Sequence, residues 1–250
     1  MVNGLLTERQ HRLVNKVIEE YIRTAEPVSS KLIASSGYFD VQSATIRNEM
    51  ADLEENGFLA QLHTSGGRVP TAKAYRLYVD MLLSHEGVTI NHAARRRMDE
   101  MLAEADLGDP EAVNKVLART VGQLSGALVM ASMSEHPDAY KFGLSNLLAF
   151  PEFREMDRLA GLTEFFDHFD GMVERMHRQF FGRSQARVRV LIGAENPDDR
   201  IKDEALICAR YRLPGGHEGT LTLVGPMRMD YRKNIGLMTY AAQLAERVAS

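Results

Sequence analysis

The stretch SATIRNEMADLEENGFL, residues 43–59, decides how the first third of this chain is interpreted. Ser43 is a favoured residue type for a helix N-cap, and Gly57 is a natural helix terminator, so the stretch predicts a helix between them. Three apolar residues share one face of that helix and are expected to be buried: Ile46, Met50 and Leu53. The opposite face begins with small and polar side chains and one long cation, which suits a helix that presents its N-terminus to a groove.

The flanking segments predict the elements that surround this helix. Thr7 and Gln10 form a capping-box pattern at the start of a first helix, residues 6–24, and a short second helix ends at Gly37. Residues 58–71 predict a hairpin with glycines at its bend, followed by a linking helix. This order is that of a winged helix-turn-helix, in which the third helix enters the DNA major groove and the wing touches the flanking backbone.

Composition restricts the class of protein. The chain has 250 residues, 44% hydrophobic and 26% charged, which is typical of a soluble globular protein. A single cysteine excludes an internal disulfide and a thiolate metal cluster, and we find neither a signal peptide nor a membrane-spanning run, so we expect a cytoplasmic protein without a membrane partner. The net charge of −4 argues against nonspecific coating of nucleic acid, so DNA binding would need a local surface and an oligomer that sums several such surfaces.

The rest of the chain predicts a second folded domain. A helix begins at Asp109, residues 127–132 read as a buried strand, and residues 152–181 are helical, with an apolar stripe of Phe165, Phe169, Met172 and Met176 that Phe180 and Phe181 extend. Three further strands, at 187–192, 204–213 and 219–225, precede a closing helix, so the fold class is α+β with an antiparallel sheet. We find no catalytic motif and no pattern that implies a cofactor or a metal.

Two ordered blocks carry a resemblance to a known family. The first comprises LTERQ (6–10), YIRTAEPVSS (21–30), residues 43–59, HTSGGRVPT (63–71) and AYRLYVDMLL (74–83). The second comprises GLSNLLAFPEF (143–153), VRVLIGAEN (188–196) and GTLTLVGPMRMDY (219–231). Together they resemble the bacterial heat-inducible transcription repressor family HrcA.

The resemblance implies a dimeric repressor of chaperone operons of the groE and dnaK type. Such a repressor binds an inverted-repeat operator in double-stranded DNA, is kept active with the help of the GroEL chaperonin, and is released on heat stress. It would lie in the bacterial cytoplasm, on the nucleoid when bound. The implied domains are a winged helix-turn-helix at 1–83, a linker with a helix at 84–108, and a reduced GAF-like regulatory and dimerisation domain with flanking helices at 109–250.

The family pattern also implies the DNA contacts. They fall on the helix at Ser43, Thr45, Arg47 and Asn48, and on the wing at His63, Thr64, Ser65 and Arg68. Arg and Asn can pair bidentately with guanine and adenine edges. Gly67 and Ala74, where the family tends toward Ala and Gly, are expected to matter little.

Two features leave other functions open. The first is the charge of three residues on the same helix, Asp52, Glu54 and Glu55, which would repel phosphate. The second is a missing segment: after the strand at 127–132 the chain lacks on the order of a hundred family residues, which is the size of one small domain. The alternatives are a winged helix that docks a protein, or a ligand-sensing regulator that uses the remaining sheet as its pocket, in either case without operator specificity.

Overall fold

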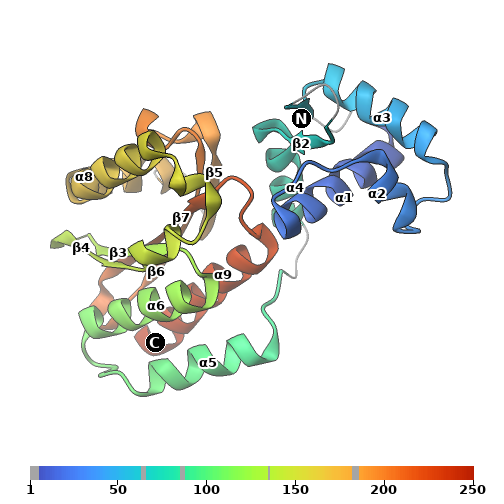
Figure 1. The fold of residues 1–250 in the computed structure, drawn as a ribbon. Coiled ribbons are helices and arrows are strands. Elements are labelled where there is room, and N and C mark those ends of the chain that lie inside the picture. Colours follow the sequence, from blue (N-terminus) through green and yellow to red (C-terminus); the bar gives the residue numbers. More distant parts are fainter. Residues whose placement is uncertain (1–5, 63–65, 85–87, 135, 182–185) are drawn as a thin grey trace. The chain divides into compact units, whose positions relative to one another are not determined.

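The computed structural model describes residues 6–62, 66–84, 88–134, 136–181 and 186–250, and of 136, 137 and 170–181 only the backbone. The chain divides into two compact units, Met1–Glu86 and Gly87–Ser250 (Figure 1).

The first unit has the element order of a winged helix. Its elements are α1 (Glu8–Thr24), α2 (Ser30–Ser35), α3 (Ser43–Glu55), β1 (Leu59–Gln61), β2 (Arg68–Pro70) and α4 (Ala72–Ser84). The predicted capping box of α1 is confirmed, because the Thr7 hydroxyl accepts from the Gln10 backbone and the Gln10 side chain accepts from the Thr7 backbone. The two wing strands pair antiparallel, with Ala60 opposite Val69.

The connection between α1 and α2 also pairs with the wing, next to strand β2. Val28 forms an isolated antiparallel bridge with Arg68, with backbone hydrogen bonds of 2.9 and 2.8 Å in the two directions. The unit closes around a core contributed by all four helices and β1. Its fully buried side chains include Leu13, Ile18, Ile33, Ile46, Met50, Leu53, Phe58 and Tyr75. The three residues predicted to form the buried face of α3 are therefore confirmed.

The second unit is built on an antiparallel sheet of five strands. The strands are β3 (Leu128–Met133), β4 (His136–Phe142), β5 (Val188–Ile192), β6 (Glu204–Arg212) and β7 (Glu218–Pro226). Their order across the sheet is β4-β3-β7-β6-β5, so the edge strands are β4 and β5. The β6–β7 hairpin turns at Gly215 and Gly216, both at positive φ, which L side chains rarely adopt.

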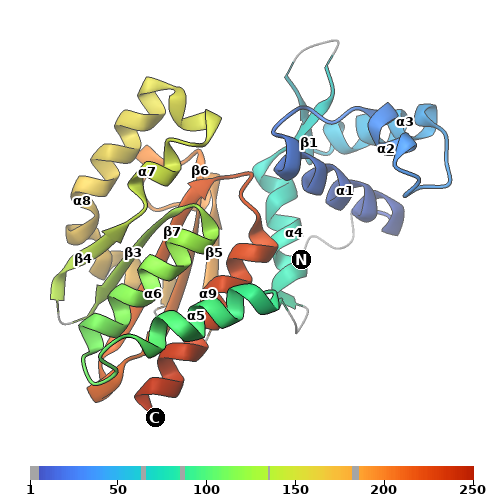
Figure 2. The same ribbon diagram turned by 60° about the horizontal axis from the view of Figure 1, so that its bottom comes forward.

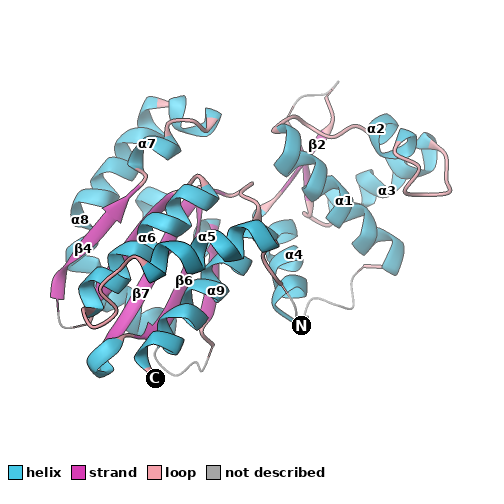
Figure 3. Cartoon of the chain, turned by 90° about the horizontal axis from the view of Figure 1, so that it is seen from below, coloured by secondary structure: helices cyan, strands magenta, loops and turns pink. Residues whose placement is uncertain are grey.

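Helices cover both faces of this sheet (Figures 2 and 3). On one face lie α5 (His92–Ala103), α6 (Pro110–Ser125) and α9 (Tyr231–Ala249). On the other lie α7 (Leu144–Leu147), the 3-10 turn η1 (Pro151–Arg154) and α8 (Met156–Phe181). The predicted start of α6 at Asp109 is confirmed, since the Asp109 side chain accepts from Glu111 N. Asp230 caps α9 in the same way, by accepting from Lys233 N. The α+β prediction, a winged helix followed by an antiparallel sheet domain with flanking helices, is confirmed.

The helix expected within 84–108 is present as α5, which buries only Met98 and Leu102. Strand β4 was not predicted, because an edge strand that begins His-Pro-Asp carries no clear apolar alternation.

The apolar stripe at 152–181 is confirmed where its side chains are described. Phe165 and Phe169 are buried and meet edge to face, with ring centroids 5.7 Å apart. The side chains of Met172, Met176, Phe180 and Phe181 lie outside the described residues. Among the helices described, none is long and apolar enough to cross a membrane.

Candidate nucleic-acid interface

Helix α3 presents a polar face on its first two turns. Thr45, Arg47 and Asn48 are exposed, while Ile46 and Met50 of the same turns are buried. Within the described part of the chain, Arg47 takes part in no ion pair. Three of the predicted contact residues thus lie on the exposed side of α3, and one of them supplies a guanidinium without an ion-pair partner in the described residues.

The acidic residue in the middle of α3 is turned away from this surface. Glu49 is 9% exposed, and its carboxylate is paired with the guanidinium of Arg9 from α1. The remaining acidic residues of α3 are Asp52, Glu54 and Glu55, all in its second half. The first two turns of α3 can therefore approach a polyanion without meeting an exposed carboxylate.

The N-terminus of α3 corrects one prediction. The N-cap is Gln42, which makes no side-chain capping bond, and Ser43 is the first helical residue. The Ser43 hydroxyl lies 3.2 Å from that of Ser30, the first residue of α2, instead of capping α3. Because no side chain caps α3, its first backbone N–H groups remain available to an anion such as a DNA phosphate.

This serine contact also brings in a residue that sequence reasoning missed. Lys31 follows Ser30 on the first turn of α2, so it is next in sequence to the serine that meets the start of α3. It is exposed, and in the part of the chain that is described it forms no ion pair. No local signal separates Lys31 from any other surface lysine, because its relation to α3 arises only from the Ser30–Ser43 contact.

The wing is present, but its tip is outside the described residues. His63, Thr64 and Ser65, three predicted contacts, fall in that tip. The base of the wing packs tightly, since a Cβ at Gly67 would lie 2.5 Å from the carbonyl carbon of Val28 and 2.6 Å from that of Pro27. The expectation that Gly67 matters little is therefore wrong for this chain, because backbone atoms leave no room for a methyl group.

Arg68, the fourth predicted wing contact, has a protein partner. Its Nε donates to Oε2 of Glu54 at 2.8 Å, and its side chain is only 15% exposed. The end of α3 is held further by the Thr71 hydroxyl, which donates to the carbonyl of Gly57, and by the Lys73 ammonium, which donates to that of Asn56. The sequence does not reveal the Glu54–Arg68 pair, since the two residues are separated by the whole first strand and the wing.

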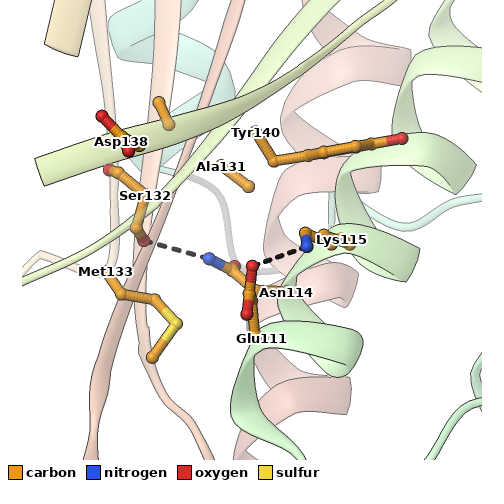
Figure 4. A pocket seen from close by; sticks show the side chains of 9 residues that line it. Glu111, Asn114, Lys115, Ala131, Ser132, Met133, Asp138 and Tyr140 are labelled. Carbon is orange, nitrogen blue, oxygen red and sulfur yellow. Dashed lines mark hydrogen bonds and ion pairs between the residues drawn. The ribbon is translucent and has the colours of Figure 1, made fainter. Parts of the chain in front are cut away.

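The second unit contains a cavity of about 260 Å³ between α6 and strands β3 and β4, lined by both polar and apolar side chains (Figure 4). Its buried amide, Asn114, donates to the carbonyl of Ser132 at 3.1 Å and accepts from the Tyr211 hydroxyl. Its cation, Lys115, is paired with Glu111 at 2.5 Å, which the figure marks with a dashed line. Asn114 and Lys115 thus already have partners within the protein, so the cavity gives no specific support to a ligand sensor.

The described residues offer no metal centre: nowhere in them do three or more His, Cys, Asp or Glu side chains gather in a way that could hold an ion. His168 instead lies with its Nδ1 2.7 Å from the carbonyl oxygen of Glu164 and near Arg200.

Comparisons with known proteins agree with this geometry. Residues 5–81 match the family model described as "Winged helix-turn-helix transcription repressor, HrcA DNA-binding", and residues 76–235 match "HrcA protein C terminal domain". A heat-inducible transcription repressor HrcA from Oceanobacillus iheyensis is 30% identical over 328 residues, covering 94% of each chain. One from Halalkalibacterium halodurans is 28% identical over 335 residues, covering 96% of each.

Both alignments run over more positions than the 250 residues of this chain, so these relatives have residues without a counterpart here. A crystal structure of a hypothetical protein has the same fold, with a TM-score of 0.80 and 19% identity over 98% of both chains. The relatives are named as transcription repressors, a class of regulators and not of enzymes. The chain belongs to the HrcA family of heat-inducible transcription repressors and carries its DNA-binding winged-helix domain.

Proposed function

We propose that this chain represses chaperone operons of the groE and dnaK type by binding an inverted-repeat operator as a homodimer, and that heat stress releases it. The observation that carries the proposal is the first half of α3, where Thr45, Arg47 and Asn48 are exposed while Glu49 is folded back onto Arg9. This arrangement supports sequence-specific readout, because it removes negative charge from the face that carries the base-reading side chains.

Each side chain has a role in this proposal. Arg47 pairs with a guanine edge and Asn48 with an adenine edge in the major groove, the pairings that their donor and acceptor geometry favours. Ser43, Thr45 and Lys31 meet phosphates at the start of α3, together with its uncapped N–H groups. His63, Thr64 and Ser65 at the wing tip meet the flanking backbone.

The twofold symmetry of the proposed inverted-repeat operator supports a dimeric repressor. Two winged helices related by a twofold axis read two half-sites, and the affinity of the pair exceeds that of one. A protein with a net charge of −4 gains little from nonspecific attraction to DNA, so a second specific half-site is the natural source of tight binding. The family resemblance implies that the GroEL chaperonin helps to keep the repressor active, and the proposal includes this partner. The repressor would lie in the cytoplasm, and on the nucleoid when it is bound to its operator.

Fluorescence anisotropy of the purified chain tests the proposal. Three labelled duplexes of equal length are compared across a salt series: the inverted repeat, a single half-site and a scrambled sequence. We expect the full repeat to bind more tightly than the half-site, and the half-site more tightly than the scrambled duplex. Sedimentation at the same protein concentrations reports whether the bound species contains two chains.

Weak, salt-sensitive binding that ignores sequence would contradict operator recognition. It would favour the alternative of a winged helix that docks a protein. Equal affinity for the repeat and the half-site, with one chain on each, would retain the DNA-reading role of α3 and remove the dimer from the proposal.

A further inference from the structure

We propose that Arg68 is a positioning residue: held by Glu54, it fixes the base of the wing to the end of the recognition helix α3, and it does not itself contact phosphate. This inference rests on the DNA binding proposed above. It also assigns a role to Glu54, an acidic residue on the proposed recognition helix: Glu54 holds Arg68 and thereby the base of the wing.

The side chains of Glu54 and Arg68 connect α3 to the wing. Arg68 is the first residue of β2, and Glu54 lies in the last turn of α3. The 2.8 Å bond between Nε and Oε2 therefore joins the recognition helix directly to the wing. The side chains of Arg68 and Glu54 are 15% and 33% exposed, so the pair is partly shielded from water and is stronger than a surface ion pair.

The backbone of Arg68 is also held in place, by the α1–α2 connection. Its N–H and C=O both bond to Val28, and the preceding Gly67 packs against the backbone of Pro27 and Val28. Arg68 thus stands where three segments meet: the end of α3, the wing, and the α1–α2 connection. A residue fixed at such a junction determines the direction in which the wing leaves the helix.

The negative charge of Glu54 disfavours a contact between Arg68 and a DNA phosphate. A phosphate close to the Arg68 guanidinium would also lie close to the Glu54 carboxylate, and the two anions repel. Arg47 differs in both respects, since it is exposed and forms no ion pair in the described residues. The structure therefore separates the two arginines into one that reads DNA and one that places the wing.

Opposite predictions follow for Glu54→Ala. If Arg68 positions the wing, the substitution weakens operator binding about tenfold, the loss that ~1.4 kcal/mol represents. If Arg68 contacts phosphate, the same substitution strengthens binding, because it frees the guanidinium and removes a negative charge. Glu55→Ala is the matched control, since it removes the same charge from an exposed neighbour with no ion pair among the described residues.

A charge-reversed double variant distinguishes positioning from the sign of the charge. Glu54→Arg combined with Arg68→Glu restores an ion pair in the opposite sense, and we expect it to recover most of the affinity that either single variant loses. Thermal unfolding of each variant is measured alongside, so that a loss of binding at unchanged Tm is assigned to the wing and not to global unfolding.

A reporter on the wing tests the inference without DNA. The chain has no tryptophan, and Leu62 is 57% exposed at the end of β1, so Leu62→Trp introduces a single fluorophore there. Time-resolved anisotropy is expected to show larger local motion of this tryptophan when Arg68→Ala or Glu54→Ala is added, and no change with Glu55→Ala.

The possible outcomes are distinct. Tighter operator binding by Glu54→Ala, failure of the charge-reversed pair to recover affinity, or an unchanged wing reporter overturns the positioning role while leaving DNA binding by the native chain intact. If the native chain does not prefer the operator at all, the proposed function fails, whereas the wing reporter still decides whether Arg68 and Glu54 hold the wing.

Discussion

The carboxylate of Glu49 lies against the guanidinium of Arg9, so the acidic side chain at the centre of the recognition helix faces α1 instead of solvent. The Glu49 side chain is 11% exposed and that of Arg9 is 52% exposed. One ion pair thus joins α3 to α1 and also keeps a negative charge off the face of α3 that we propose to read DNA.

Arg9→Ala is expected to destabilise the first unit by about 1–2 kcal/mol, because it leaves a mostly buried carboxylate without its partner. Differential scanning calorimetry of the full chain measures the effect on the transition of this unit. Arg23→Ala is the control, since the Arg23 side chain is 66% exposed and its partner Glu20 keeps a second cation, Lys16, at 3.1 Å, so the substitution leaves no carboxylate unpaired. Equal effects of the two substitutions would show that the Arg9–Glu49 pair is no stronger than a surface pair.

Arg47→Ala is expected to weaken binding to the operator by about 1–3 kcal/mol and to change binding to a scrambled duplex much less. The reason is that the substitution removes the proposed bidentate contact to a base edge, and such a contact forms only on the correct sequence. Anisotropy with both duplexes at one salt concentration measures the difference. Arg96→Ala, which removes an 81% exposed arginine from α5, is the control. Equal losses on the two duplexes would assign Arg47 to a phosphate instead.

Gly67→Ala is expected to displace the wing, because the added Cβ would lie 2.5 Å from the Val28 backbone, closer than real Cβ contacts. The cost of such overpacking is about 1–3 kcal/mol, so we expect both a lower Tm of the first unit and weaker operator binding. Gly108→Ala serves as the control, since its Cβ would meet only the Asp106 side chain at 3.4 Å. Unchanged stability and binding of Gly67→Ala would show that the α1–α2 connection yields at no cost.

Glu204 makes the stability of the second unit depend on pH. Burial raises the pKa of this carboxyl from 4.5 to about 7, and the ion pair with Arg158 offsets that effect only in part. Because the folded state holds the proton more tightly than the unfolded state, stability falls as pH rises from about 4.5 to about 7 and is then constant. The full effect is at most about 3 kcal/mol.

Glu204→Gln removes this titration, so the difference in Tm between the native chain and the variant is expected to change across that pH range and to level off above it. Thermal unfolding at about pH 4, 5, 6, 7 and 8, which brackets the range of about 4.5 to about 7, supplies the measurement. Parallel Tm curves for the two proteins would mean that Glu204 ionises alike in the folded and unfolded chain.

Cys208 offers a probe for the opening of the second unit. Burial raises the pKa of this thiol to about 12, and the side chain is 1% exposed. Because the thiolate is the reactive form, alkylation at pH 8 is expected to be slow in the native chain and to accelerate as the unit opens on heating. Mass spectrometry of the iodoacetamide adduct follows the rate, and the single cysteine makes the assignment unique. Alkylation as fast as that of a free cysteine at low temperature would contradict a closed core around β6.

The sequence by itself determined the elements that local chemistry specifies. The Thr7–Gln10 capping box, the apolar face of α3, the cap at Asp109 and the strands β3, β5, β6 and β7 follow from residue type and spacing, and the structure contains each of them. Residues in one helix or strand are neighbours whatever the rest of the chain does, so periodicity and capping reveal them.

Only the tertiary structure decided which polar side chains are paired and which are free. The sequence names both Arg47 and Arg68 as DNA contacts, and it presents Glu54 as a source of repulsion for phosphate. The fold pairs Glu49 with Arg9 and Glu54 with Arg68, and leaves Arg47 exposed. These pairs join residues distant in sequence, and their partners are chosen by how α1, α3 and the wing pack. No local pattern of residues carries that information.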